Sequence, residues 1–522
     1  MRQHEFREVS AGMKNIIPAL KWVREKKKYM ASDSKVKEMD CITDGLCKPL
    51  LPKQDIDDLW QKIYSNCSFM QKKLQKLGGS LHFSHFLLPD KFTVNVDAEP
   101  VPRQIARRTV FASGFLVPRN KISALAGGFY IRGDQMGDLD NIAAQHKNSI
   151  VSNFAYFFTP ELVSRPDYGY NTLRPEDEHL PKGLSPFLGG FAYDRGDFPP
   201  LFNRGGIGFI DNKVFVVSSW NVKRCTVFIS RNPVEVNSVN VPDTGQDAIL
   251  YTPKYTTGAS LSEEKKVLED PNYTGWMRFA EKVGNGRVNI VVSNRGNGEY
   301  PVPEIVYCRF GEIIMPSCCA VVSFSRKKFI EIFPDIKISE GSYLDRKLTA
   351  GIDISFKVNP PEEVSEKEWK NISFFYSGLH PLMAGGKNFA ENMDTIMENM
   401  YEHYQLHPRS LQAQETYIPN PFRREPRCLL VQTNDDKIGI FTFSGRYECS
   451  VGANYFEVMS VLKKIHGDNL KNVFMLDSGS AVKLGYVDEK GETQPLMLPS
   501  IGVRNYIGNI KGNVYSLLFF RL

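Results

Sequence analysis

NVFMLDSGSAVKLGY, at residues 472–486, is the most informative stretch of this 522-residue chain. The four apolar residues 473–476, followed by small ones, predict a short buried β-strand. Asp477 stands where that strand ends, which places a carboxylate at the edge of a sheet. Residues 478–480, Ser-Gly-Ser, carry so little side chain that a ligand could approach their backbone N–H groups. The plain alternative is a strand that ends in an ordinary Asp-Ser-Gly turn.

Around this stretch the chain predicts an α+β protein. Residues 55–77 place apolar side chains on one helix face, with Asp55 as N-cap and Gly78 as the stop. From about residue 105, short apolar runs separated by Gly, Asn, Asp and Pro indicate strands. We predict strands at 109–117, 122–130, 206–210, 214–217 and 287–292, and helices at 388–406 and 454–466. A helical segment at 1–95 therefore precedes a mixed-sheet domain at 105–522.

The composition is that of a globular protein, with 42% hydrophobic and 24% charged residues. A chain of this length predicts roughly two to four domains, or one large domain with insertions. Nine cysteines are scattered without a CxxC motif or zinc spacing. No P-loop or dinucleotide-binding fingerprint is present either, so we expect neither a metal nor another cofactor. The scattered cysteines fit a reducing setting best.

The positive charge of the chain belongs to its N-terminal part. The net charge is +6, and residues 1–80 hold 16 Lys and Arg against 10 Asp and Glu, so the rest is formally neutral. A solvated helix face is the first explanation, and a weak contact with an anionic surface is the second. No nucleic-acid partner is expected, because no reading motif accompanies the charge.

The sequence shows no targeting or membrane-spanning signal. No stretch approaches the ~20 apolar residues of a transmembrane helix, and residues 1–30 lack a signal-peptide core. These features predict a cytoplasmic protein, or one exported without a cleavable signal.

Several short motifs follow one another after residue 105. In order, they are Ala126-Gly127-Gly128-Phe129-Tyr130, Ser377-Gly378-Leu379-His380-Pro381, Pro426-Arg427, a predicted helix carrying Glu457, Asp477-Ser478-Gly479-Ser480 and Val503-Arg504-Asn505. Their order and spacing resemble the phosphodiester glycosidase family. The resemblance covers roughly residues 105–522, with an insertion at about 220–350. It implies a mixed-sheet domain of that type.

The same resemblance implies which residues bind substrate. The family has an Asn-Gly-Gly-Phe-Phe stretch, a Leu-Asp-Gly-Gly-Gly-Ser loop and a closing Arg-Pro segment. Here Ala126 replaces the first Asn, and serines replace two of the loop glycines. The implied substrate-binding residues are Gly127, Gly128, Phe129, Tyr130, Gly378, Ser478, Gly479, Ser480 and Arg504.

The implied activity is hydrolysis of a glycosyl phosphodiester or a related sugar–phosphate linkage. The substrate would be a glycosyl-phosphate small molecule or a glycoconjugate. Asp477 would stabilise charge at the anomeric carbon, Glu457 would be the second carboxylate, and Arg427 would hold the phosphate. Group transfer in place of hydrolysis stays open.

Each implied role has a structural alternative. Glu457 could be a first-turn carboxylate that favours its helix, and Arg427 could form a salt bridge at a strand edge. Phe129 and Tyr130 could be part of the core, and Arg504 could anchor a loop. A catalytically altered relative that only binds a carbohydrate, a phosphate or a protein partner is the rival function, and Ser478 and Ser480 favour it.

Overall fold

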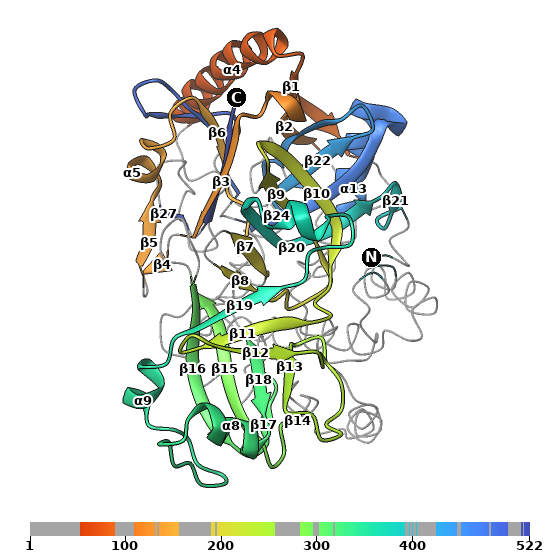
Figure 1. The fold of residues 1–522 in the computed structure, drawn as a ribbon. Helices are drawn as coiled ribbons and strands as arrows, with labels where there is room; N and C mark the ends of the chain where they lie inside the picture. The colour runs from red at the N-terminus through yellow and green to blue at the C-terminus, as the bar shows by residue number, and fades with distance from the viewer. Residues whose placement is uncertain are drawn as a thin grey trace, which may run out of the picture.

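The computed structural model confirms the α+β class, with many strands and few helices (Figure 1). It describes residues 53–88, 109–129, 131–132, 135–155, 189–193, 196–255, 282–295, 302–316, 319–391, 396, 399, 403, 424–445, 450, 452–479, 482–498, 513–514 and 516–522.

A sheet of 14 strands forms the main body. Its strands, in order across the sheet, are β1 (Ser80–Leu87), β2 (Thr109–Pro118), β23 (Lys437–Phe443), β22 (Arg427–Thr433), β24 (Leu470–Ser478), β20 (Ile372–Ala384), β7 (Phe191–Tyr193), β8 (Gly196–Phe198), β19 (Ile354–Val358), β11 (Cys225–Ile229) and β12 (Asn232–Val236). Off this path, β9 (Arg204–Ile210) and β21 (Lys387–Asn388) pair with β20, and β10 (Lys213–Trp220) pairs with β9. Every residue of β22 is buried, because both faces of this part of the sheet are covered.

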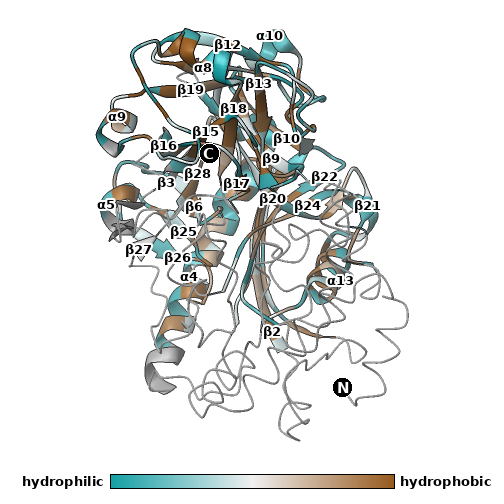
Figure 2. Ribbon diagram, turned by 90° about the horizontal axis from the view of Figure 1, so that it is seen from below, coloured by the Kyte–Doolittle hydropathy of each residue, from teal (hydrophilic) through white to brown (hydrophobic). Residues whose placement is uncertain are grey.

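A five-stranded sheet covers one face of the main sheet. Its order is β26 (Thr493–Pro495), β25 (Leu484–Val487), β6 (Ser149–Ser152), β28 (Ser516–Arg521) and β3 (Ala124–Phe129). Between the two sheets lies an apolar layer in which Phe374, Tyr376 and Phe474 of the main sheet pack with Leu484 and Phe520. We call this the inter-sheet layer. Helix α4 (Lys53–Lys76) adds one apolar face to it, and Figure 2 shows the alternation of hydrophobic and hydrophilic residues along that helix.

Helix α13 (Tyr455–His466) covers the opposite face of β22 and β24, which confirms the helix predicted at 454–466. Val458 and Leu462 of the helix belong to the same core cluster as Leu429 of β22. The helix begins in a capping box: the Asn454 side chain accepts from the Glu457 N–H at 2.8 Å, and Glu457 accepts from the Asn454 N–H at 3.0 Å. This arrangement satisfies two N–H groups at the helix start.

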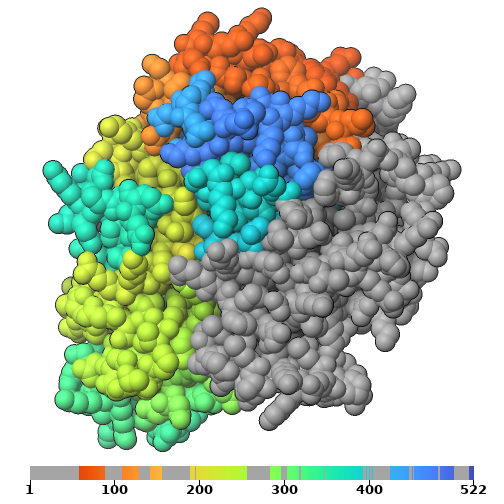
Figure 3. Space-filling view, turned by 90° about the vertical axis from the view of Figure 1, so that its right-hand side faces the viewer, coloured from red at the N-terminus to blue at the C-terminus, as the bar shows by residue number. Residues whose placement is uncertain are grey.

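The predicted insertion contributes a sheet of its own at the end of the molecule away from α4 (Figures 1 and 3). Its order is β13 (Ala248–Tyr251), β18 (Ala320–Phe324), β15 (Val288–Arg295) and β16 (Val302–Phe310), beside the pair β14 (Lys282–Val283) and β17 (Ile313–Ile314). Helices α8 (Arg326–Ile332) and α9 (Arg346–Ala350) flank it. The remaining short elements are α5 (Leu139–Ala143), α10 (Glu366–Trp369), η2 (Arg119–Lys121), η6 (Gly467–Asn469) and a sheet of β27 (Asn513–Val514), β5 (Gln135–Asp138) and β4 (Ile131–Arg132). The division into domains stays a prediction.

Two local predictions are tested clearly. The strands predicted at 206–210 and 214–217 are confirmed by β9 and β10, which pair as a hairpin with Asp211 and Asn212 at positive φ, as a tight hairpin turn requires. The description of residues 1–95 as helical is wrong at 80–87, which form β1. All eight residues of β1 pair with β2, so pairing with a distant strand decides this segment. Residues 1–52 lie outside the described residues.

Within the described ranges, no helix combines the length and apolar character needed to cross a membrane.

Candidate active site

Asp477 lies at the end of β24, on the face toward the five-stranded sheet. In the antiparallel pairing of β22 and β24, Asp477 stands opposite Cys428, and Ser478 stands opposite Arg427. Opposite residues share a face and successive residues alternate. Cys428 belongs to the inter-sheet layer, so the Asp477 carboxyl enters that layer too. The strand predicted at 473–476 is confirmed.

Two neutral donors hold the Asp477 carboxyl, whose residue is only 5% exposed. Asn153 Nδ2 donates to Oδ2 at 2.7 Å, and the Ser478 N–H donates to Oδ1 at 2.7 Å. Burial raises the pKa of Asp477 to about 7, although the Ser478 and Asn153 hydrogen bonds act to lower it. Burial dominates because it penalises the charged form. A carboxyl that titrates near neutrality can take up and release a proton at physiological pH.

Asn153 directly follows β6 and connects the two sheets. Its Oδ1 accepts from the Lys483 N–H at 2.8 Å, while its amide donates to Asp477. The neighbouring Ser152 Oγ donates to the Lys483 carbonyl at 3.1 Å and lies 3.0 Å from Cys428 Sγ. The end of β6, the start of β25 and the end of β24 are therefore joined by polar contacts within an otherwise apolar layer.

Further titratable groups lie around this network. Lys483 is buried, and burial lowers its pKa to about 8. Burial raises the pKa of Tyr376, with Arg204 acting to lower it and Asp477 acting to raise it. Arg204 is 1% exposed, and its guanidinium lies 4.7 Å from the centre of the Phe202 ring. Besides Lys483, the buried Arg204 therefore lies in the region of Asp477, and the sequence motifs did not indicate it.

Arg427 begins β22, but its side chain turns toward α13. Its Nε donates to the Ala453 carbonyl at 3.0 Å, and its guanidinium carbon lies 5.0 Å from the centre of the Tyr455 ring. Burial raises the pKa of Tyr455, with Arg427 and then Arg204 acting to lower it. Arg427 and Asp477 thus lie at the same end of the β22–β24 pair, on opposite faces. Phosphate binding by Arg427 stays a prediction.

The structural alternative explains the placement of Glu457. Its carboxylate, fully buried, forms an ion pair with Arg424, whose Nη2 lies 2.6 Å from Oε1 and whose Nε lies 3.0 Å from the same oxygen. The other oxygen accepts from the Asn454 N–H in the capping box. Both oxygens are therefore occupied by α13 and Arg424. The catalytic role predicted for Glu457 has no support in these contacts.

Packing requires glycine at two of the predicted positions, 127 and 378. A Cβ at Gly127 would come within 2.3 Å of the Phe374 ring, so β3 can lie on β20 only without that atom. In the same strand β3, Gly128 pairs with Leu517 of the neighbouring strand β28. Gly378 has φ +139°, and a Cβ there would lie 2.6 Å from the Tyr376 hydroxyl. Substrate contacts by these glycines stay predictions.

The loop after β24 is described only at its start. Ser478 and Gly479, which directly follow the buried Asp477, are partly exposed. The Gly479 N–H donates to the Pro426 carbonyl at 3.0 Å, and its φ is +77°. Tyr130, Ser480 and Arg504 lie outside the described residues, and Phe129 is described only by its backbone in β3.

Sequence reasoning missed Asn153. The family's Asn-led motif was matched to residues 126–130, where Ala126 replaces the Asn. The segment Asn153-Phe154-Ala155 also follows a short apolar strand and joins an Asn to an aromatic residue. The sequence therefore contained a second possible match to the Asn-led motif, but the paired glycines at 127–128 favoured the earlier strand.

Other candidate clusters have structural explanations. His82 and His85 face opposite sides of β1, His82 toward His466 at a ring distance of 5.3 Å and His85 toward Trp60 at 5.1 Å. Among the residues that the structure describes, no three His, Cys, Asp or Glu side chains group as a metal site would require.

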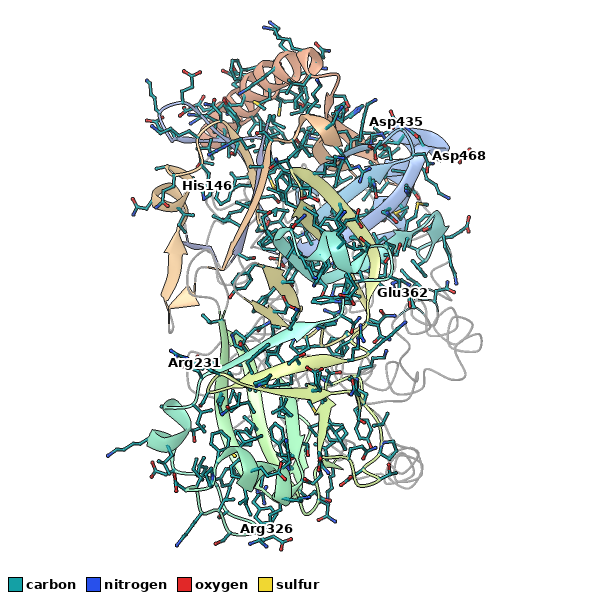
Figure 4. The ribbon with its side chains drawn as sticks, viewed as in Figure 1. His146, Arg231, Arg326, Glu362, Asp435 and Asp468 are labelled. Carbon is teal, nitrogen blue, oxygen red and sulfur yellow. The ribbon has the colours of Figure 1, made fainter. Side chains whose placement is uncertain are left out.

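The acidic residues at the turn after β22 also bind close neighbours. Figure 4 shows Asp435 and Asp468 near each other on adjacent turns. Asp435 pairs with Lys437 at 2.7 Å, and Asn434 donates to the Asp468 carbonyl at 3.2 Å. These contacts account for the cluster as part of two linked turns.

Comparison with known proteins gives distant likenesses only. No family model matches the chain, and no curated protein matches it. Its structure is similar to that of a hypothetical protein from Synechocystis, at 12% identity over 84% of this chain and 62% of that chain, with a TM-score of 0.38. The chain thus spans less than two thirds of that protein.

Two further solved structures are similar at comparable distance. One is a protein described as exported from Burkholderia pseudomallei, at 11% identity over 78% of this chain and 73% of that chain, with a TM-score of 0.39. The other is the catalytic domain of zebrafish N-acetylglucosamine-1-phosphodiester alpha-N-acetylglucosaminidase, auto-inhibited by its pro-peptide, at 9% identity over 85% of this chain and 83% of that chain, with a TM-score of 0.34. A hydrolase domain is therefore among its distant structural neighbours.

Proposed function

We propose that this chain hydrolyses a glycosyl phosphodiester or a related sugar–phosphate linkage, with Asp477 at the reaction centre. The observation that carries the proposal is the state of Asp477: a buried carboxyl beside a partly exposed loop, held by neutral donors, with its pKa raised to about 7. A general base works best when its pKa lies near the operating pH. The ordered sequence motifs supply the substrate class.

In the proposed reaction, a water molecule attacks the anomeric carbon of the sugar. The bond between that carbon and the phosphate oxygen breaks, and its electron pair leaves with the phosphate. Ionised Asp477 stabilises the positive charge that develops on the sugar ring and accepts the proton from the attacking water. The products are a free sugar and a phosphate monoester, and Asp477 then releases its proton to solvent.

The negative charge of the leaving phosphate needs a cation. Arg427 stands opposite Ser478 at the end of β24. Arg204 acts to lower the pKa of Tyr376 on one side of the sheet and that of Tyr455 on the other. Guanidinium groups suit a phosphate because they can donate two parallel hydrogen bonds. In this proposal Arg204 balances the phosphate charge, and Arg427, which lies on the face opposite Asp477, adds to it around the shared end of β22 and β24. Glu457 only supports α13.

A non-catalytic binding protein is the second candidate. It is favoured by the contacts of two of the three predicted catalytic residues: Glu457 is held by Arg424 and the helix cap, and Arg427 packs on Tyr455. In that case Asp477 would be a buried connection between the sheets, and the loop at Ser478 would bind a ligand without turning it over.

The test is release of free sugar from a panel of sugar-1-phosphodiesters by three proteins: wild type, Asp477→Asn and Asp197→Asn. Asp197 is a matched control because it is 6% exposed, has its pKa raised to about 7 by burial and accepts from the Val358 N–H at 2.7 Å, in a different part of the sheet. The proposal expects turnover by wild type and Asp197→Asn only. Calorimetric binding of a panel member without any turnover would support the binding protein instead.

A further inference from the structure

We propose that Asn153 is a positioning residue, whose side-chain amide holds the Asp477 carboxyl in one orientation and couples it to the start of β25. The effect of Asn153 on catalysis rests on the proposed function. Its effect on the orientation and pKa of Asp477 does not. It assigns a role to a residue that the motif comparison did not identify.

The Asn153 amide is used at both ends. Its Nδ2 donates to Asp477 Oδ2 at 2.7 Å, and its Oδ1 accepts from the Lys483 N–H at 2.8 Å. A backbone N–H can only donate, so Oδ1 must face Lys483 and the NH₂ group must face Asp477. The amide cannot rotate by half a turn without placing two donors, or two acceptors, against each other.

The backbone around Asn153 is also fixed. The Ser152 hydroxyl, which has a single proton to donate, lies within hydrogen-bond distance of the Asn153 carbonyl at 2.9 Å and of the Lys483 carbonyl at 3.1 Å. Asn153 itself is 3% exposed. The polar path from β25 through Asn153 to Asp477 is therefore shielded from solvent, where a hydrogen bond to a charged group is stronger than in water.

The bond selects the charged form of Asp477. An amide N–H donates to a carboxylate oxygen, and this donation stabilises the ionised acid against burial. Asn153 is accordingly one of the groups that lower the pKa of Asp477. Without it, burial opposed only by the Ser478 N–H would keep the carboxyl protonated to higher pH, and less of the base would be ionised at neutrality.

The experiment follows the titration of Asp477 by NMR on protein with ¹³C-labelled aspartate, using Asp477→Asn to identify the signal. In Asn153→Ala, the midpoint should rise by about one pH unit, since a lost hydrogen bond to a charged group corresponds to a shift of that order. The matched control is Asn472→Ala. Asn472 is an equally buried amide on the same strand as Asp477, donating to Gln432 at 2.7 Å and accepting from the Gly385 N–H at 2.8 Å, and its removal should leave the midpoint unchanged.

An unchanged midpoint in Asn153→Ala, or an equal rise in Asn472→Ala, would overturn the inference and leave Asn153 a merely structural link. If Asn153→Ala does not fold, a pH titration of the wild-type protein still tests the contact between Asn153 and Asp477. The Asn153 side-chain amide proton should then shift with pH at the midpoint of Asp477, and a signal that stays constant through that range contradicts the contact.

An activity measurement separates this inference from the proposed function. With an active substrate, Asn153→Ala should lower kcat about 10- to 100-fold with little change in KM, as expected for a residue that orients a base. The pH at which kcat is half its maximum should rise together with the NMR midpoint. A wild type that cleaves no phosphodiester refutes the proposed function, while the two titrations still judge the role of Asn153.

Discussion

Two buried carboxylates near the β22–β24 pair, Asp477 and Glu457, have opposite surroundings. Asp477 is held by an amide and a backbone N–H, and its pKa is raised to about 7. Glu457 is held by the Arg424 guanidinium and by the start of α13. The contacts of Glu457 with a cation and a helix N-terminus are those of a structural ion pair. A buried acid with neutral donors alone keeps a proton equilibrium that chemistry can use.

From the contrast between Asp477 and Glu457 we expect the largest effect to be the loss of activity in Asp477→Asn. Loss of a general base typically costs about 10²- to 10⁴-fold in rate, and we expect kcat to fall by this order. The measurement is sugar release with the best substrate of the panel. Thermal unfolding should show the variant folded but less stable, because the single carbonyl oxygen of an Asn side chain can accept from the Ser478 N–H while its NH₂ group then faces the Asn153 NH₂ group. Activity close to that of wild type would place the reaction elsewhere.

Glu457→Gln should act on stability instead. Removing one partner of a buried ion pair leaves the other charge uncompensated, so we expect the free energy of unfolding to fall by about 3 kcal/mol. Denaturant titration measures this loss. Turnover per folded molecule should remain at the wild-type level, because Glu457 has no part in the proposed reaction. A variant that is stable but inactive would reverse the roles assigned to the two carboxylates.

The pH dependence of stability distinguishes Asp477 further. Its folded pKa of about 7 lies above the unfolded value near 3.8, so its favourable contribution is fully present below about pH 4 and is lost as pH rises through 7. The loss should be on the order of 4 kcal/mol, since each pKa unit corresponds to about 1.4 kcal/mol, and Asp477→Asn should remove this part of the slope. Unfolding free energies at pH 4 and pH 8 test this. Asp197→Asn should show a similar change, since burial raises its pKa in the same way.

The smallest effect is expected for Tyr455→Phe. The Tyr455 hydroxyl is buried and makes no hydrogen bond to any residue in the described part of the chain. Its removal should change the free energy of unfolding by less than about 1 kcal/mol, since the hydroxyl leaves no partner unsatisfied. A rise in KM without a change in stability would bring this side of the sheet into substrate binding. A large loss of stability would show that the hydroxyl has a structural partner.

The elements of the fold could be predicted wherever the sequence pattern is local. The apolar run of β24, the capped helix α13 and the β9–β10 hairpin each show their structure within about ten to fifteen residues. The strand β1 could not be predicted in this way, because its structure depends on pairing with β2. The Asn153–Asp477 contact spans 324 positions in the sequence, and no local pattern indicates such a distance.

The site itself was predictable in part. Asp477 was indicated by its place at a strand end, but its partners were not. The ion pair of Glu457 depends on Arg424, which is 33 residues away, and alternation along β22 turns Arg427 to the face opposite Asp477. Sequence motifs identify which residues gather near a strand end. The face on which each side chain lies is set by strand register, and register depends on tertiary packing.

The most direct test of the central claim is the pH dependence of kcat/KM for the best phosphodiester substrate. With Asp477 as the base, kcat/KM should rise with pH along a single limb whose midpoint lies near 7, and Asp477→Asn should lose both the activity and this limb. A limb near the ordinary carboxyl pKa, or one that persists unchanged in Asp477→Asn, would contradict the account.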